Sequence, residues 1–229
     1  MKIKSEMLIV VFISILLVFS SGCARQKELE RINRSQASTI LSLNDEIARL
    51  NDELEELTRS REQLEKTQVM LQQRLRDELE KGDLQVSMQD KGLVVTVLNK
   101  ILFDSGKTIL KPTSVSTLQK VGDVLKNEVP QQLILVEGHT DTDPIKYSGF
   151  RSNWELSTAR ATEVVHFFID KIGIDPGRLV ALGYGEYQPI APNASSAGKS
   201  KNRRVEIVIS PKKFIKKFID TGSEQEGLK

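Results

Sequence analysis

The sequence is poor in several residue types, and each scarcity excludes a class of protein. A single cysteine, Cys23, excludes an intramolecular disulfide, and the chain has only two histidines, so a Cys/His zinc site is not expected. Lys and Arg number 33 against 31 Asp and Glu, a net charge of +2, without the basic excess that nucleic-acid binding requires. We therefore expect no metal, no cofactor and no nucleic-acid partner.

Residues 1–22 are typical of a bacterial export signal. Two lysines give a basic start, and the apolar run at 7–19 is about 13 residues long, against the roughly 20 that a membrane-spanning helix needs. The small residues before Cys23 resemble a lipobox, although Ser20 stands where such signals usually have leucine. The resemblance implies diacylation of Cys23, and Ala24 in place of Asp gives no inner-membrane retention signal. A retained N-terminal membrane helix is the alternative.

Residues 23–82 predict a helical spacer, because charge is dense and neither proline nor glycine occurs between 27 and 81. Apolar residues recur every seventh position in two columns, one containing Ile40, Ile47 and Leu54 and the other Leu29, Leu43, Leu50, Leu57, Leu64 and Leu71. Isoleucine in one column and leucine in the other favour a parallel two-stranded coiled coil, hence a homodimer. Such a rod would be about 80 Å long. An amphipathic helix folded back on a globular domain is the alternative.

Residues 84–210 have the composition of a globular domain. Two runs of alternating apolar residues flank the turn at Lys91-Gly92, which predicts a hairpin. Helical spacing follows Pro112 and again Ser152, which forms an S-x-x-E capping box with Glu155. Further short strands are predicted at 133–136, 178–183 and 204–209. The order β-β-α-β-α-β-β predicts an α+β sandwich with helices on one face of a mixed sheet.

Four motifs lie along this segment in a fixed order. They are Leu102-Phe103-Asp104, Gly138-His139-Thr140-Asp141, Asn153-Trp154-Glu155-Leu156-Ser157-Thr158-Ala159-Arg160-Ala161 and Asn202-Arg203-Arg204-Val205-Glu206. Together they resemble the OmpA-like peptidoglycan-binding domain found at the C-termini of OmpA porins, the Pal lipoprotein and the stator protein MotB. The resemblance covers about residues 92–210. It implies non-catalytic binding of the peptidoglycan stem peptide, usually through meso-diaminopimelate.

The free end of diaminopimelate carries an ammonium and a carboxylate on one carbon, so its site needs a fixed anion and a fixed cation. Carried over from the family motif, Asp141 would bind the ammonium and Arg160 the carboxylate, which its planar guanidinium can grip with two hydrogen bonds. Asn153, seven residues earlier, shares the helical face of Arg160 beside the helix N-terminus. The resemblance adds Thr140, Asp104 and Arg203 to the pocket.

The three segments together predict an outer-membrane lipoprotein that faces the periplasm and tethers its membrane to the cell wall. A stator subunit with a retained N-terminal helix is the alternative, but no acidic residue lies between positions 7 and 23 to carry an ion. A wall hydrolase using His139 and Asp141 is another. One histidine and one carboxylate provide neither a metal shell nor an activated nucleophile, so we expect no enzymatic activity.

Two further segments complete the sequence. The loop at 142–152 is longer than in the shorter family members, and we expect it to be a tolerated insertion; contact with glycan or with a partner is the alternative. In the C-terminal tail, 211–229, paired lysines alternate with Phe-Ile pairs between Lys212 and Ile219, which predicts a helix whose apolar side packs on the domain.

Overall fold

The computed structural model describes residues 2–145 and 149–210, with side chains from residue 25 onward. The chain divides into two compact units, residues 1–56 and 57–229. Among the described residues, no helix is long and apolar enough to span a membrane. The predicted helix of the C-terminal tail lies outside the described residues, as do the side chains of the predicted export signal.

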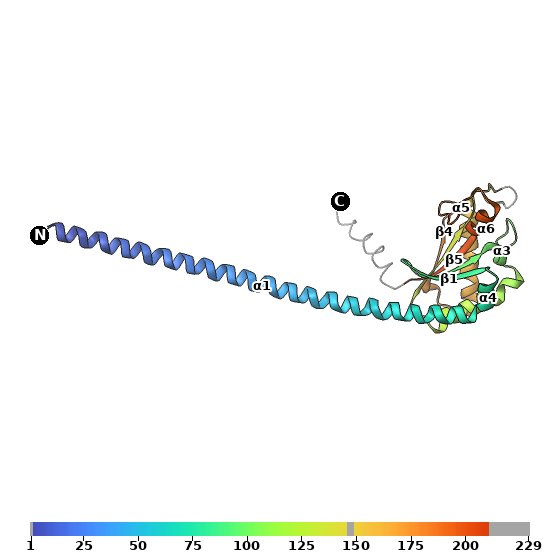
Figure 1. Cartoon of the computed structure of the whole chain (residues 1–229), viewed down its shortest axis with the longest axis horizontal. Helices are drawn as coiled ribbons and strands as arrows, with labels where there is room; N and C mark the ends of the chain where they lie inside the picture. The colour runs from blue at the N-terminus through green and yellow to red at the C-terminus, as the bar shows by residue number, and fades with distance from the viewer. Residues whose placement is uncertain (1, 146–148, 211–229) are drawn as a thin grey trace. The chain divides into compact units, whose positions relative to one another are not determined.

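Helix α1 (Lys2–Arg74) forms the described part of the first unit up to residue 56, and its remaining residues belong to the second unit (Figure 1). Its apolar residues are mostly exposed: Leu29, Ile40, Leu43, Ile47, Leu50 and Leu54. Ion pairs one turn apart, such as Arg49 with Glu46 at 2.6 Å, support the helix on its polar side. The predicted helix is therefore confirmed, whereas its role as a spacer and its assembly into a coiled coil stay predictions; this uncovered stripe supports the second.

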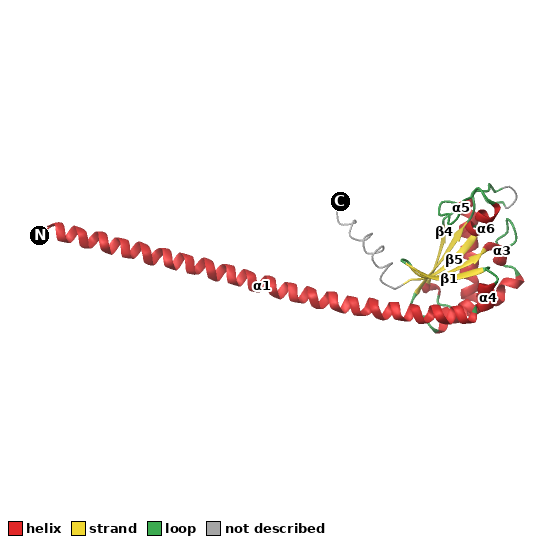
Figure 2. Cartoon of the chain, viewed as in Figure 1, coloured by secondary structure: helices red, strands yellow, loops and turns green. Residues whose placement is uncertain are grey.

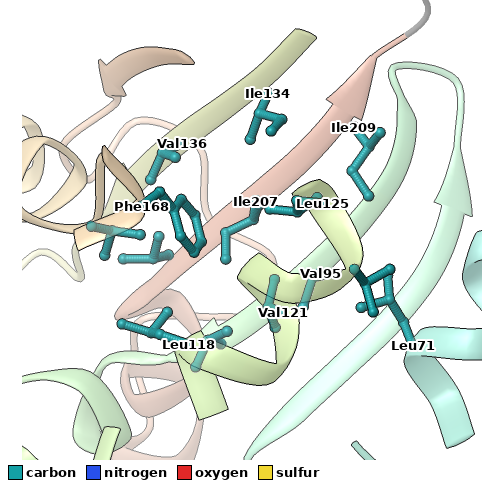
Figure 3. Close-up of a cluster of buried hydrophobic side chains, with 14 of the residues drawn as sticks. Leu71, Val95, Leu118, Val121, Leu125, Ile134, Val136, Phe168, Ile207 and Ile209 are labelled. Atoms are coloured by element: carbon teal, nitrogen blue, oxygen red, sulfur yellow. The ribbon is translucent and has the colours of Figure 1, made fainter. Parts of the chain in front are cut away.

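The last turns of α1 behave differently, because their apolar side chains belong to the core of the second unit. Leu64, Leu71 and Leu75 are buried there, and Figure 3 shows Leu71 in the same hydrophobic cluster as residues of the sheet. The side chain of Gln63 also donates to the carbonyl of Glu128 at 2.9 Å. For this stretch the structure agrees with the alternative of a helix folded against the domain. The compact unit thus begins at Leu57 and contains the predicted domain, 84–210.

The second unit is built on one five-stranded sheet (Figure 2). The strands are β1 (Leu84–Gln89), β2 (Gly92–Leu98), β3 (Leu133–His139), β4 (Leu179–Gly183) and β5 (Arg204–Ser210). They lie in the order β1-β2-β5-β3-β4. The pair β3–β4 is parallel, and the other three neighbouring pairs are antiparallel. The mixed sheet and the β-β-α-β-α-β-β order of its main elements confirm the predicted fold class.

Helices complete the unit. They are α2 (Arg76–Glu80), α3 (Asn99–Leu102), α4 (Val115–Asn127), α5 (Asn153–Phe167) and α6 (Ser196–Asn202), with short 3-10 or π turns at Pro112–Ser114, Phe168–Ile172 and Pro176–Arg178. The sequence predicted α4 and α5 and placed α2 within the long helix before Gly82, but it did not predict the short α3 and α6. Short helices lack enough turns for apolar periodicity to become visible.

The core lies between the sheet and the helices on one of its faces. One row of apolar side chains crosses all five strands in register: Val86, Val95, Ile207, Val136 and Ala181. Leu118, Val121 and Leu125 of α4 and Phe168 after α5 pack in the same cluster (Figure 3). Since side chains alternate between faces, their neighbours in the strands, including Glu137 and Glu206, point to the opposite face.

Two local expectations change in the structure. Ser152 is the N-cap residue of α5 as predicted, but its side chain makes no capping hydrogen bond. The carboxylate of Glu155 accepts instead from the backbone N–H of Arg151 at 2.5 Å, so the predicted reciprocal capping box is wrong. Strand β3 also extends to His139, beyond the predicted end at residue 136. The extension places Thr140 and Asp141 at the edge of the sheet.

Candidate functional site

A hollow of about 940 Å³ opens beside the end of β3 and the N-terminus of α5. All six residues predicted for the binding site line it: Asp104, Thr140, Asp141, Asn153, Arg160 and Arg203. They come from different elements. Asp104 follows α3, Thr140 and Asp141 follow β3, Asn153 and Arg160 lie two turns apart on α5, and Arg203 precedes β5. The fold therefore brings together residues that are up to about a hundred positions apart.

Two glycines allow α5 to approach the sheet closely enough to form this hollow. A Cβ atom at Gly138 of β3 would lie 2.0 Å from the carbonyl oxygen of Ser157, and one at Gly183 of β4 would lie 2.1 Å from Oγ1 of Thr158. Real Cβ atoms cannot approach so closely, so any larger residue would displace the helix. Because α5 carries both Asn153 and Arg160, these glycines fix the position of the site.

Asp141 is buried and already engaged. Its carboxylate forms an ion pair with Arg203, and its Oδ1 accepts from the backbone N–H of Asp143 at 3.1 Å. The side chain of Asp141 is 6% exposed, whereas that of Arg203 is 42% exposed. A ligand ammonium that reaches Asp141 would therefore share this carboxylate with Arg203.

Arg160 is equally buried, at 5% exposure, but it has no anionic partner. Its Nε donates to the carbonyl of Lys107 at 3.1 Å, and its guanidinium lies over the ring of Phe103, 5.3 Å from the centroid. No carboxylate pairs with it among the residues that the structure describes. Burial lowers the pKa of Arg160 to about 10, the charge of Arg203 acts in the same direction, and Asp141 opposes them. The site thus holds a buried cation whose natural complement is a carboxylate.

Asn153 organises the rim of the hollow. Its amide nitrogen lies within donating distance of the carbonyls of Asp141 at 3.3 Å and Asp143 at 3.2 Å, and of Oε2 of Glu186 at 2.6 Å. These bonds join the loop after β3, the start of α5 and the loop after β4. Asn153 therefore positions the loop of Asp141 as well as bordering the hollow.

Two other polar groups of residues lining the hollow have no hydrogen-bond partner within the described part of the chain. They are Oγ1 of Thr140 and Oδ1 of Asn99, both buried. Buried polar atoms are nearly always satisfied, so each is a candidate to bind a ligand or water. The backbone N–H of Thr140 is already used, since it donates to the carbonyl of Gly185 at 2.8 Å.

Asp104 lies at the exposed edge of the hollow, where Lys107 is 3.3 Å and Lys111 is 4.0 Å from its carboxylate. Cationic residues outnumber anionic ones around the hollow. The cations are Lys100, Lys107, Lys111, Arg160 and Arg203, and the anions are Asp104, Asp141 and Asp143. This excess favours a ligand with more carboxylates than amines.

The sequence did not identify three contributors to the site. Phe103 supports the guanidinium of Arg160, the carbonyl of Lys107 orients it, and Asn99 borders the hollow. Only Phe103 had a local signal, because it is a large apolar residue directly before Asp104 in the first motif. A backbone carbonyl leaves no trace in a sequence.

The hydrolase alternative required His139 and Asp141 to act together. The ring of His139 stacks on Tyr184 instead, with centroids 5.2 Å apart, while Asp141 pairs with Arg203. Burial lowers the pKa of His139 to about 3, and the charge of Arg204 adds to the effect. The imidazole is therefore neutral at physiological pH. The geometry provides no activated nucleophile at this position.

His139 also belongs to the one group of described residues that could offer ligands to a metal ion, together with Glu137 and Glu206. The ammonium of Lys91 lies 2.6 Å from each of the two glutamates. A metal would have to displace it. The cluster is thus a self-neutralised ion network on the sheet face opposite the core.

Comparison with known proteins agrees with this geometry. Residues 102–203 match the model of the OmpA family. The cell wall anchor of the T6SS from Pseudomonas aeruginosa is 34% identical, with a TM-score of 0.56 over 62% of this chain and 97% of that one. Residues 102–203 form an OmpA-family domain.

Other relatives match the same OmpA-family domain. Motility protein B of Bacillus subtilis (strain 168) is 38% identical over 138 residues, which cover 60% of this chain and 52% of that protein. YiaD of Escherichia coli (strain K12), a probable lipoprotein, is 36% identical over 138 residues, 60% of each chain. The matches span roughly half to three fifths of these two curated relatives. They therefore define the domain and not the function of the whole protein.

Proposed function

We propose that the OmpA-family domain binds the stem peptide of peptidoglycan through the zwitterionic end of diaminopimelate, without catalysis. The observation that carries the proposal is Arg160, a buried cation that pairs with no carboxylate of the described residues and lines the same hollow as Asp141. The ligand carboxylate would accept hydrogen bonds from Arg160, and the ligand ammonium would donate to Asp141. Thr140 and Asn99 would supply further polar contacts, while Asp104 and Arg203 would border the ligand.

The pairing of Asp141 with Arg203 adds a detail to this binding mode. Since Arg203 is much more exposed than Asp141, it can shift toward solvent or toward a second ligand carboxylate when the ammonium arrives. The cationic excess around the hollow suits a stem peptide, which carries several carboxylates. All stem peptides carry carboxylates, so the overall positive charge around the hollow does not distinguish them. In this proposal Arg160 distinguishes diaminopimelate stems from lysine stems, which lack the second carboxylate.

The rest of the chain fits a tether. In this proposal Cys23 is diacylated, the mature protein lies on the periplasmic face of the outer membrane, and residues 29–57 of α1 form a parallel homodimeric coiled coil. The exposed apolar stripe on α1 supports the coil, and the probable lipoprotein YiaD is a relative with a similar domain. The wall anchor of the T6SS supports the assignment of the domain to the cell wall.

A stator subunit is the second candidate, favoured by the 38% identity to Motility protein B. That identity extends over only 60% of this chain, and a porin is equally similar: Outer membrane porin F of Pseudomonas fluorescens is 39% identical over 117 residues. The absence of an acidic residue between positions 7 and 23 argues for the lipoprotein.

Two experiments test the proposal. In the first, the purified chain is sedimented with peptidoglycan sacculi. We expect co-sedimentation without release of soluble fragments; an unbound chain contradicts the wall tether, and released fragments contradict the non-catalytic role. In the second, cells expressing the chain are labelled with a fatty acid. Label that is present in the wild type and lost in Cys23→Ser supports the lipid anchor, and an unlabelled wild type favours the retained helix.

A further inference from the structure

An exposed pair of aromatic rings lies at the N-terminal end of α5. Trp154 and Tyr187 stack with centroids 5.2 Å apart and ring planes at 23°. They remain 47% and 65% exposed, although aromatic side chains of this size are usually covered. The two rings together form an aromatic platform that contributes nothing to the hydrophobic core.

The platform adjoins the stem-peptide hollow. Trp154 follows Asn153, which borders the hollow, and Tyr187 follows Glu186, whose carboxylate accepts from the amide of Asn153 at 2.6 Å. Gly185 packs between them, since a Cβ atom there would lie 3.5 Å from both the Trp154 nitrogen and a ring carbon of Tyr187. The loop after β4 and the start of α5 are thus held together, and the platform continues the rim of the hollow.

We propose that this platform binds a sugar ring of the glycan strand that carries the stem peptide. The proposal rests on the function proposed above and adds a carbohydrate subsite to it. A pyranose presents a face of C–H groups with partial positive charge, which packs favourably on the negative face of an aromatic ring. The carboxylate of Glu186 lies at the edge of the platform and can accept a hydrogen bond from a sugar hydroxyl.

Chain length supports the same occupant. The stem joins its sugar only a few residues before diaminopimelate, and each extended residue spans at most about 3.5 Å. A glycan bound through its stem at Arg160 and Asp141 therefore passes close to the rim of the hollow. The platform lies at this rim, so we expect the glycan to be its ligand.

The chain provides its own probe, because Trp154 is its only tryptophan. The experiment titrates the full chain with a free stem peptide, with the same stem attached to its disaccharide, and with glycan freed of stems, and follows tryptophan emission and binding heat. We expect the disaccharide-linked stem to bind about two- to tenfold more tightly than the free stem. We also expect it to shift the emission, whereas the free stem leaves emission nearly unchanged.

Four variants test whether the platform causes this gain. Trp154→Ala and Tyr187→Ala should bind the free stem with wild-type affinity and lose the gain from the disaccharide. Trp154→Ala keeps the backbone carbonyl that accepts from Ser157 and Thr158, so the first turn of α5 is retained. Trp154→Phe, which keeps an aromatic face, and Ile190→Ala, which removes an exposed apolar side chain outside the stacked pair, should keep the gain.

The outcomes separate the subsite from the proposed function. A disaccharide that adds no affinity to the wild type, or a gain that survives both alanine variants, overturns the subsite while stem binding stands. Binding of glycan with an emission shift but no binding of any stem supports the platform and overturns the stem-peptide function. Binding of neither stem nor glycan overturns both.

Discussion

The carboxylate of Asp141 is paired with the guanidinium of Arg203, while Arg160 in the same hollow has no described carboxylate partner. The two arginines therefore have different tasks. Arg203 pairs directly with Asp141, whereas the buried charge of Arg160 is compensated by a cation–π contact, one carbonyl and the more distant charge of Asp141. Such an arrangement binds anions at the expense of the stability of the free protein.

The first prediction concerns that balance. Arg160→Gln should leave the free energy of unfolding of the ligand-free chain within about 1 kcal/mol of the wild type, because it removes a desolvated charge along with its contacts. Its binding of the diaminopimelate stem should fall by about 10- to 100-fold. Urea denaturation and calorimetry measure the two quantities.

Arg178 provides the matched control. It donates to three backbone carbonyls, those of Gln132, Leu125 and Val129, at 2.5–3.1 Å, and none of these residues lines the hollow. Arg178→Gln should therefore lower the free energy of unfolding by about 2 kcal/mol and leave binding unchanged. A large loss of stability in Arg160→Gln would show that Arg160 is instead a structural residue.

The second prediction concerns the close contact of α5 with the sheet. Gly138→Ala should destabilise the domain by about 1–3 kcal/mol or more and weaken binding, because the new Cβ atom must displace Ser157 and the helix that carries Arg160. Gly177→Ala is the control, since its nearest neighbour would lie at an ordinary 3.4 Å. Thermal unfolding and stem binding that are unchanged in Gly138→Ala would contradict the account.

The third prediction separates the two parts of α1. Leu71→Ala should cost about 2–5 kcal/mol of domain stability, because Leu71 is fully buried in the core cluster. Leu43→Ala, on the exposed stripe, should leave the thermal unfolding of the domain unchanged and weaken the dimer. Sedimentation of both variants measures the dimer. A monomeric wild type would contradict the coiled coil, and an undestabilised Leu71→Ala would contradict the packing of the helix on its own domain.

The fourth prediction follows from the buried imidazole of His139, whose folded-state pKa of about 3 lies below the ordinary value of 6.5. Between these pH values the unfolded chain binds a proton that the folded chain does not bind. This contribution to stability is therefore complete above pH 6.5 and is lost as the pH falls to 3, by on the order of 5 kcal/mol at most.

His139→Phe tests this contribution, because phenylalanine keeps a ring against Tyr184 but does not titrate. Its stability should fall less steeply than that of the wild type between pH 6.5 and 3. Burial raises the pKa of Glu137, which acts in the opposite direction in both proteins, so the difference between the two curves isolates His139. Parallel curves would contradict the prediction.

The sequence predicted the sheet and the two long helices because their apolar residues follow clear periods of two and of about 3.6. All six residues that it predicted for the site, through motifs whose order matched a known domain, are among those that line the hollow. It did not predict that Leu64 and Leu71 leave the exposed stripe of α1 to enter the core. One apolar stripe has the same spacing whether a second helix or a domain covers it, so only the fold distinguishes the two.

The ion pair between Asp141 and Arg203 could not be predicted from the sequence either. Asp141 and Arg203 are 62 positions apart, and nothing local shows that they pair while Arg160 remains without a described carboxylate. The capping box failed for a related reason. Glu155 has the correct spacing from Ser152, but its carboxylate accepts a hydrogen bond from the backbone N–H of Arg151 instead. Spacing shows which contacts are possible, and packing decides which of them form.

The most direct test of the account compares two stem peptides by calorimetry with the full chain, one containing meso-diaminopimelate and one containing lysine, which lacks the second carboxylate. We predict that the wild type binds the diaminopimelate stem at least about tenfold more tightly, a difference of 1.4 kcal/mol. Arg160→Gln should bind both stems equally weakly, and Asp141→Asn should weaken both. Equal binding of the two stems by the wild type, or a preference that survives Arg160→Gln, would contradict the zwitterion site.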